Sequence, residues 1–382
     1  TNSTTYVDKT TLTFTPEDNS TYLIIASWLF YGGSSSTARR PFTKLTRTTD
    51  TAKDFAEIII AVPVINEYQS AMGIGLDTFG ASPGSQTYKI QHKHEANTEL
   101  DGIKEAKIIA IKKDTSDQSA EVDARSTTTA TTYQDKTTLT FTPSSQGDYI
   151  ILASAVLDQS GTNYETGCVL DIDGTGYGEG AFEPGTAADR AAWGIVKRVN
   201  LTAASHTIKI QFKSSNSLGT AGIINARIIA LRADTFDNNY YTDSTIRTTT
   251  TSSTYSNKIT LTQTPQAVSH VIFASLIYDE ALGDETNRAG VRLVEASTTI
   301  AESDNAVEAA DTKQTFFALY RKTLAATSTA FKLDYKNSDN VEIVGADESA
   351  ISVIQLDATP AGGAAGDDWP KFQRRGFWNW EF

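Results

Sequence analysis

Short stretches in which apolar and polar residues alternate recur along the whole chain and predict β-strands. In residues 136–142, Leu139 and Phe141 point to one side of an extended backbone and the intervening threonines to the other. The β-branched side chain of threonine favours the pleated, half-buried surface of a sheet. No long stretch has a convincing helical period. The pattern therefore predicts an all-β protein.

One of these strands is present three times. YVDKTTLTFTP at 6–16 returns as YQDKTTLTFTP at 133–143 and as YSNKITLTQTP at 255–265, at offsets of 127 and 122 residues. Such a period exceeds the 20–50 residues of solenoids and propellers and matches the size of an independent domain. Three further blocks recur once in each repeat. They are an apolar run ending in Ala-Ser (22–27, 149–154, 270–275), an alternating block with lysines (87–93, 207–213, 330–336) and an apolar closing block (106–114, 226–234, 349–357).

We interpret all four blocks as strands with one buried (dry) face and one solvent-exposed (wet) face. Strands separated by Asp-Gly, Gly-Ser and Thr-Pro turns predict antiparallel β-sandwiches. The predicted division is a first sandwich (1–114), a linker strand with a second sandwich (115–234), a linker strand with a third (235–357), and a flexible tether with an extended aromatic tail (358–382).

The second repeat resembles a known class of sandwich. GDYIILAS at 147–154, the hairpin around Asp173-Gly174 and LTAASHTIKI at 201–210 follow the strand order of jelly-roll domains. C1q/TNF-like modules and β-sandwich carbohydrate-binding modules are similar to this. The resemblance implies the fold and leaves structural, adhesive and sugar-binding functions open.

Composition and charge limit the possible binding partners of the chain and its possible location. The net charge of −13 argues against nucleic acid and against anchoring on anionic lipid. No run of about twenty apolar residues is present, so we expect no membrane insertion. The sequence starts at Thr1 rather than Met, and Cys168 is the only cysteine. We therefore expect a processed protein without intrachain disulfides, located outside the cell, on the cell surface or on a virion.

Three Asn-x-Ser/Thr sequons are candidate glycosylation sites. They begin at Asn2, Asn19 and Asn200. In a chain this rich in serine and threonine, such motifs also arise by chance.

Residues 171–179 form the best candidate for a metal site. Asp171, Asp173 and Glu179 lie among glycines, as in a calcium-binding loop. The bidentate glutamate that an EF-hand needs at its twelfth position is absent, because that position is Phe182. The third repeat has Leu293 near Asp171. A β-hairpin with a glycine-rich tip is the alternative, so we predict no cofactor, with Ca²⁺ as the one ion to test.

The repeats also test candidate catalytic groups, because a residue proposed in one copy can be sought in the other two. His92 and His94 share one strand face, but no third ligand is visible, and exposed strand residues are the alternative. No catalytic constellation recurs, so we predict that the chain is not an enzyme. Aromatic residues in or beside predicted loops suit stacking on sugar rings, or else fill the cores: Trp28, Tyr31, Tyr164, Tyr177 and Trp193.

The segments between repeats resemble one another. Residues 114–133, with Arg125, match 234–255, with Arg247, and each reads as an extended segment that feeds the next repeat. The first repeat lacks most of this segment. We therefore expect an unpaired edge or an open groove there.

The C-terminal segment, by contrast, contains a possible strand that has no partner of its own. After a tether rich in glycine and alanine, Trp378, Trp380 and Phe382 alternate, so a strand would place them on one face. We predict that this tail docks on another copy by strand addition, with the arginines pairing an acidic rim. The alternative is folding back on the third repeat. The predicted assembly residues are Trp369, Phe372, Arg374, Arg375, Phe377, Trp378, Trp380 and Phe382.

These observations favour a non-enzymatic structural subunit of an extracellular filament, sheath, surface layer or virion appendage. Its partners would be copies of itself, joined head to tail. The alternative hypothesis is a secreted carbohydrate-binding adhesin, whose partners would be glycans.

Overall fold

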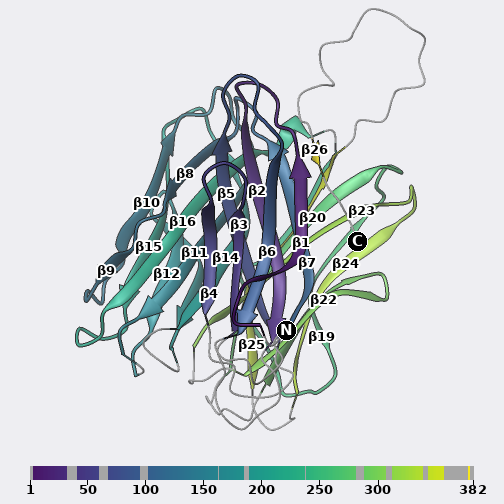
Figure 1. Ribbon diagram of the computed structural model, residues 1–382. Helices are drawn as coiled ribbons and strands as arrows, with labels where there is room; N and C mark the ends of the chain where they lie inside the picture. Colours follow the sequence, from purple (N-terminus) through teal and green to yellow (C-terminus); the bar gives the residue numbers. More distant parts are fainter. Residues whose placement is uncertain are drawn as a thin grey trace, which may run out of the picture.

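The computed structural model describes residues 3–31, 41–59, 68–94, 102–161, 163–184, 189–236, 238–280, 288–306, 312–338, 343–356 and 377–378. Its regular elements are strands apart from one short 3₁₀ helix, η1 (Ala233–Thr235). The strands form antiparallel sheets that pack as sandwiches with the order of jelly rolls (Figure 1). The predicted all-β, jelly-roll-like fold is confirmed.

The first repeat (1–114) contributes two layers. Its outer sheet has the order β1 (Val7–Phe14), β6 (Gln86–His94), β3 (Pro41–Arg47) and β4 (Lys53–Ile59). Its inner sheet has the order β26 (Phe377–Trp378), β7 (Gly102–Lys112), β2 (Thr21–Tyr31) and β5 (Gln69–Thr78).

The second repeat (115–234) has the same plan. Its outer sheet is β10 (Gln134–Phe141), β15 (His206–Ser214), β12 (Thr166–Ile172) and β13 (Thr175–Phe182). Its inner sheet is β8 (Gln118–Val122), β16 (Ala221–Arg232), β11 (Gly147–Gln159) and β14 (Arg190–Leu201), and β9 (Ser126–Thr128) also pairs with β16.

The third repeat (235–357) repeats it again. Its outer sheet is β19 (Ser256–Gln263), β24 (Thr329–Asn337), β21 (Arg288–Glu295) and β22 (Thr298–Ala306). Its inner sheet is β17 (Asn239–Ser244), β25 (Val344–Gln355), β20 (Ser269–Glu280) and β23 (Gln314–Thr323), and β18 (Thr248–Thr250) also pairs with β25.

The inner sheets are buried on both faces, which explains why their central strands are apolar without alternation. In β2, Ile24 and Trp28 face the core of their own repeat, whereas Leu23 and Ile25 face the other two repeats. The prediction of one wet face is therefore wrong for the Ala-Ser blocks and the closing blocks. It holds for β10, where Leu139 is buried and the flanking threonines are exposed.

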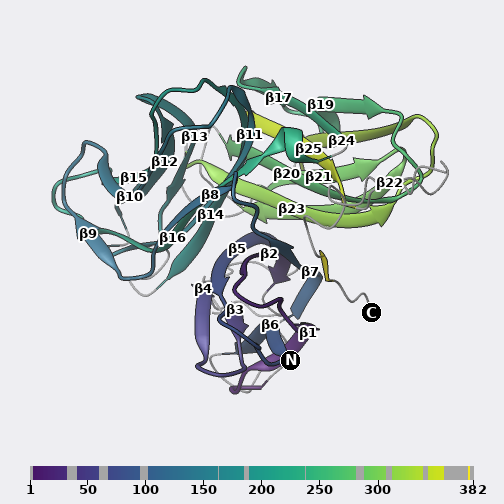
Figure 2. The ribbon, with the colours of Figure 1, turned by 90° about the horizontal axis from the view of Figure 1, so that it is seen from above.

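The outward faces of the inner sheets meet in one apolar core shared by the three repeats. Viewed from above, the repeats lie around this common centre (Figure 2). Each repeat supplies aliphatic or aromatic side chains to the shared core: Leu23, Ile25, Met72, Ile74, Ile109, Ile111, Ile150, Leu152, Val196, Ile229, Leu231, Ala233, Phe236, Val271, Phe273, Phe317, Leu319, Ala350 and Ile354.

The serines that end the first and third Ala-Ser blocks form hydrogen bonds across the boundaries between repeats. The Leu319 amide of the third repeat donates a hydrogen bond to Ser27 Oγ of the first, at 3.0 Å. The Val196 amide of the second donates to Ser275 Oγ of the third, also at 3.0 Å. Both serines are buried, so each hydroxyl satisfies a backbone donor from a neighbouring repeat.

Charged groups also join the repeats. Arg227 is fully buried and donates to the Phe55 carbonyl of the first repeat at 2.7 Å, and it also pairs with Glu121. Lys197 of the second repeat pairs with Asp243 (2.9 Å) and Glu348 (3.3 Å). The sheets themselves touch, because Arg190 of β14 pairs with Ile59 of β4. The predicted domain boundaries stay a prediction, since sheet and core run across them.

A shared core predicts cooperative unfolding of the whole chain. Leu152→Ala removes a fully buried side chain from the shared core and should lower the free energy of unfolding by about 2–5 kcal/mol. Chemical denaturation followed by tryptophan fluorescence and circular dichroism should give one coincident, shifted transition. The matched control is Leu218→Ala, at a side chain that is 79% exposed, which should change little. Three separate transitions, with only one shifted, would show that the repeats are independent.

Candidate assembly interface

Each repeat has one strand that lies alongside its last strand, at the edge of the inner sheet. We call this the edge-strand position. In the second repeat it is occupied by β8, which pairs with β16, and in the third by β17, which pairs with β25. In both cases the strand comes from the segment that links one repeat to the next. In the first repeat the position is occupied by β26, from the C-terminal tail, which pairs with β7.

The three edge strands share direction and register. Ala110, Ala230 and Val353 are equivalent, because each lies opposite the same isoleucine of the repeat, Ile24, Ile151 or Ile272. The edge-strand residues that face them are Trp378 opposite Ala110, Gln118 opposite Ala230 and Tyr240 opposite Val353. All three pairings are antiparallel, so the tail residue Trp378 takes the place that Gln118 and Tyr240 take elsewhere.

The described part of the tail therefore lies on the first repeat of its own chain, where the sequence predicted an open edge. The contact is not with the third repeat, which was the alternative. Phe377 pairs with Ile111 and Trp378 with Ala110. The other predicted assembly residues lie outside the described residues: Trp369, Phe372, Arg374, Arg375, Trp380 and Phe382. Docking on a second copy stays a prediction.

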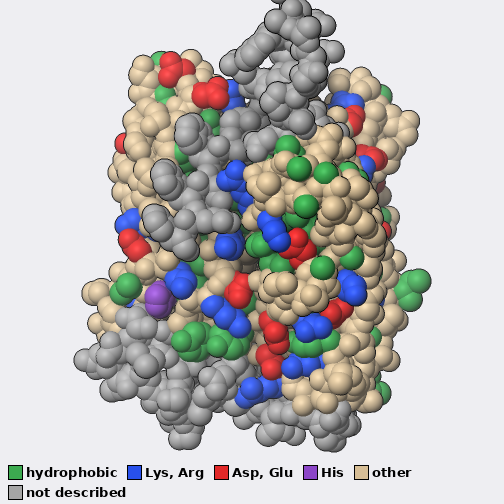
Figure 3. Space-filling model, turned by 90° about the vertical axis from the view of Figure 1, so that its right-hand side faces the viewer, with side chains coloured by type: hydrophobic (Ala, Val, Ile, Leu, Met, Phe, Trp, Pro, Cys, Tyr) green, Lys and Arg blue, Asp and Glu red, His purple; other side chains and the backbone are tan. Residues whose placement is uncertain are grey.

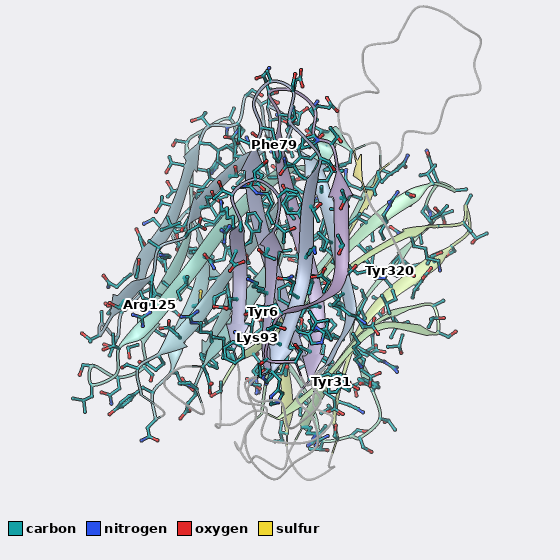
Figure 4. The ribbon with its side chains drawn as sticks, viewed as in Figure 1. Tyr6, Tyr31, Phe79, Lys93, Arg125 and Tyr320 are labelled. Carbon is teal, nitrogen blue, oxygen red and sulfur yellow. The ribbon has the colours of Figure 1, made fainter. Side chains whose placement is uncertain are left out.

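An arginine fastens the edge strands of the second and third repeats. Arg125 donates to both carboxylate oxygens of Asp158, at 2.8 and 2.7 Å, and Arg247 donates to Asp279 at 2.6 Å. The residue equivalent to these aspartates in β2 is Tyr31. Figure 4 marks Arg125 in the second repeat and Tyr31 in the first. The repeated arginines were visible in the sequence, but their acidic partners lie about 30 residues away and were not recognised.

A glycine opposite each of these residues makes room for the fastening. A Cβ on Gly222 would lie 1.8 Å from Asp158 Oδ1, and one on Gly345 would lie 2.2 Å from Asp279 Oδ1. A Cβ on Gly102 would lie 2.1 Å from the Tyr31 ring. The first repeat thus keeps the glycine but replaces the charged anchor with a tyrosine, so its edge strand lacks this ion pair.

A second recurring group occupies the outer sheets. In each repeat the first tyrosine of the repeated block donates to a glutamate, and a lysine ammonium lies over its ring. Burial raises the pKa of all three tyrosines, and the glutamate raises it further. Figure 4 marks Tyr6 and Lys93 side by side. The groups are Tyr6–Glu57 (2.8 Å) with Lys93, Tyr133–Glu179 (2.5 Å) with Lys213, and Tyr255–Glu302 (2.7 Å) with Lys336.

This group bears on the predicted metal site, because Glu179 belongs to it. Glu179 also binds Lys213 at 3.1 Å. Asp173 lies in the turn of the β12–β13 hairpin, where it binds His206 at 2.6 Å and accepts the Thr207 amide at 2.8 Å. Asp171 accepts the Gly174 amide. Within the described residues, no three carboxylate, histidine or cysteine side chains gather where they could hold a metal ion. Calcium binding stays an untested prediction.

His92 and His94 are buried in β6, so the expectation that they are exposed strand residues is wrong. Burial lowers the pKa of His92 to about 4. Cys168 is buried as well, and burial raises the pKa of its thiol.

The aromatic residues predicted for sugar stacking divide into two groups. Trp28 and Trp193 are fully buried in strands, so their placement in or beside loops is wrong. Their indole N–H groups donate to Thr43 Oγ1 and to the Gly178 carbonyl. Tyr31, Tyr164 and Tyr177 are partly exposed.

An open groove lies between the second and third repeats. Its volume is about 460 Å³, and its lining includes Tyr133, Gln211, Glu179, Lys313 and Glu348. An aromatic edge among amide, carboxylate and ammonium groups is chemically suited to polar ligands.

The remaining surface features concern glycosylation and charge. Asn19 and Asn200 are exposed, and Asn2 lies outside the described residues. Asn200 already donates to Asp148 at 2.7 Å. On the side drawn in Figure 3, acidic and basic side chains are interspersed. Across the described residues, no helix is both long and apolar enough to span a membrane.

No protein-family model matches the chain, and no curated protein matches it. Among solved structures it is similar to a chain of Sulfolobus Turreted Icosahedral Virus, at 8% identity and a TM-score of 0.22, over 91% of this chain and 84% of that one. It is also similar to tandem CBM51 modules of a family 98 glycoside hydrolase from Streptococcus pneumoniae, at 9% identity and 0.19, over 68% and 86%.

A third solved structure, of the triple jelly roll fold and turret assembly in an archaeal virus, matches at 8% identity and a TM-score of 0.21, over 90% of this chain and 82% of that one. Both kinds of protein that the sequence resembles, jelly-roll proteins and carbohydrate-binding modules, are thus among the neighbours. At this level of similarity they carry no argument about function, and the fold assignment rests on the strand order itself.

The burial of His92 predicts a stability change in mild acid. Because its folded pKa, about 4, lies below the ordinary value of 6.5, the unfolded state binds more protons between these values. The free energy of unfolding should therefore fall as the pH is lowered from about 6.5 to 4. His92→Asn should flatten this part of the profile in urea denaturation at several pH values. A His92→Asn profile parallel to the parent's would refute the assignment.

Proposed function

We propose that this chain is a non-enzymatic structural subunit of an extracellular filament, sheath, surface layer or virion appendage. It would join copies of itself head to tail through strand addition. The observation that carries the proposal is the occupation of the first repeat's edge-strand position by the C-terminal tail. A strand supplied from beyond the sandwich that it completes is the element by which subunits join in donor-strand assemblies.

The shared core supports a structural role. Three sandwiches that bury both faces of their inner sheets against one another form a stiff unit, because relative motion would expose apolar side chains. Such stiffness suits a building block better than it suits a protein whose parts must move.

The titratable groups also support it. The largest upward changes in tyrosine pKa include those of the first tyrosine in the Lys–Tyr–Glu groups, which recur in all three repeats. A group present in every repeat and built into the outer sheet is explained by fold stability.

A second candidate function is glycan binding, and the groove between the second and third repeats favours it. Tyr133 and Gln211 line this groove together with several charged side chains. The burial of Trp28 and Trp193 removes the strongest stacking residues, so the proposal of a structural subunit ranks first.

Electron microscopy and size-exclusion chromatography test the structural role. The full chain should form ordered filaments or sheets as its concentration rises, and a chain cut after Gly366 should not. Trp378→Pro in the full chain should also stay monomeric, because proline removes an amide from the β26–β7 pairing and disfavours extension of the ladder. The matched control is Ala364→Pro, in the tether, which should assemble like the parent.

Monomers from every variant at every concentration would overturn the structural proposal. In that case a glycan array with the full chain, and with Tyr133→Ala and Gln211→Ala, would test the second candidate.

A further inference from the structure

We infer that the groove between the second and third repeats binds an organic ligand through a primary ammonium group, which lies over the ring of Tyr133 with its charge balanced by Asp171. Amino sugars and polyamines carry such a group. The inference rests on the second candidate function, because it names the chemistry of the ligand in the groove suited to glycans. It is independent of how copies of the chain join.

The first tyrosine of the repeated block has two cations over its ring in the first and third repeats. One is the lysine of the Lys–Tyr–Glu group, and the other is a basic residue of the outer sheet. Tyr133, in the second repeat, has Lys213 at 4.4 Å from the ring centre and, among the described residues, no second cation. The second repeat therefore has a ring that lacks a cation where its sisters hold one. The second cations are Lys44 over Tyr6, at 4.4 Å, and Arg292 over Tyr255, at 3.8 Å.

Val169 stands where the other repeats have this second cation. It lies opposite Gln211, and in the other two repeats the residue opposite the equivalent of Gln211 is the second cation. Two residues further along β12, Asp171 stands where the other repeats have a neutral residue. One face of the outer sheet thus has an apolar side chain in place of a cation and a carboxylate in place of a neutral group. The equivalent pairs are Lys44 and Thr46 in the first repeat and Arg292 and Val294 in the third.

A glycine makes room for a ligand at this face. Gly176 of β13 lies three residues before the glutamate of its Lys–Tyr–Glu group, where the other repeats have Asp54 and Thr299. A Cβ on Gly176 would lie 3.2 Å from Val169 Cγ2, so a side chain there would cover the same spot. The resulting groove of about 460 Å³ adjoins a second hollow of about 320 Å³, and the two share part of their lining. This volume is in the range of sites for small polar ligands.

The cations nearest to this face already have carboxylate partners. Lys313 in the groove pairs with Asp347 at 3.2 Å, and Lys209, which lies opposite Asp171, pairs with Asp135 at 2.7 Å. Among the described residues, Asp171 forms no ion pair and accepts one hydrogen bond, from a hairpin amide. An ammonium group that enters the groove therefore meets a carboxylate without a cation near an aromatic ring.

Those are the two kinds of partner that the second cations have in the sister repeats. Lys44 pairs with Asp54 at 3.1 Å, and Arg292 pairs with Asp334 at 3.1 Å, while each lies over its tyrosine ring. A metal ion would need more carboxylates, and no three potential ligands gather within the described residues. An ammonium group needs only one carboxylate and an aromatic ring. The groove thus offers a ligand the partners that a side chain of the same repeat takes elsewhere.

Isothermal titration calorimetry with the full chain tests the ligand chemistry. The three probes are a glucosamine tetrasaccharide, the same tetrasaccharide fully N-acetylated, and a linear polyamine, each in low salt at a pH that keeps the amines protonated. We expect at least one amine probe to bind about tenfold or more tightly than the acetylated sugar, because acetylation removes the positive charge. Binding of the glucosamine probe alone would identify an amino sugar as the source of the ammonium group. Comparable binding of the polyamine would identify a free amine.

Two variants locate the binding in the groove. Val169→Lys supplies the cation that the first repeat has at this position and should weaken amine binding about tenfold or more. Asp171→Asn keeps the size of a hairpin side chain, removes its charge and should weaken binding about three- to tenfold. The control Thr140→Lys adds the same charge at an exposed position of the same sheet and should change the affinity less than about twofold. Circular dichroism confirms that each variant is folded.

The possible failures are distinguishable. Equal binding of the acetylated and free sugars would overturn the ammonium site while leaving glycan binding in the groove standing. Absence of binding by all three probes would overturn the inference, and the glycan array would then decide the second candidate function by itself. Amine binding that is unchanged in both folded variants, Val169→Lys and Asp171→Asn, would overturn the assignment to this groove.

Discussion

The fold depends on burial of both faces of the three inner sheets. A free-standing sandwich needs only one buried face per sheet, yet β2, β11 and β20 are buried at every position of the Ala-Ser run. The second face of each inner sheet is buried only by the other two repeats. Leu23, Leu152 and Phe273 all belong to the core that the repeats share. At about 25 cal/mol per Å² of apolar surface removed from water, this contact makes the separated repeats unfavourable. The serines and Arg227 then satisfy the polar groups that the contact buries.

The shared core in turn brings the edge-strand positions within reach of neighbouring segments. A strand edge presents unpaired amides and carbonyls that another segment will pair with. The links after the first and second repeats are short, and the edge strand that each one supplies is fastened by an arginine. The first repeat obtains the same strand from the far end of the chain. One rule, that each repeat is completed by the segment leaving another, therefore accounts for all three edges.

Much of this could be predicted from the sequence because the signals are local. Alternation in residues 136–142 and the threefold copy of that block gave the strand class and the repeat. The shared core could not be predicted: the run at 22–27 is compatible with one packed face or two, and only the three-dimensional arrangement decides which. Trp28 and Trp193 show the same limit, because burial depends on partners far away in sequence. From the comparison with 114–133, the sequence predicted an open edge at the first repeat, and the structure places β26 at that edge. For the segment that occupies this edge, the sequence predicted only an aromatic strand that needs a groove to pack in.

If the proposed function holds, stability and assembly are two uses of one surface. In the second and third repeats, the edge strand follows a short link and is held by an ion pair between an arginine and an aspartate. Opening such an edge would break the backbone hydrogen bonds of the strand and the ion pair together. In the first repeat the described ladder begins with the pairs Phe377–Ile111 and Trp378–Ala110, at the end of a long tether and without the aspartate. Among the described residues, the edge of the first repeat is therefore the least fastened of the three, and its strand comes from the far end of the chain. Strengthening that edge within the chain would be expected to oppose joining between chains, because both draw on the same amides and carbonyls of β7.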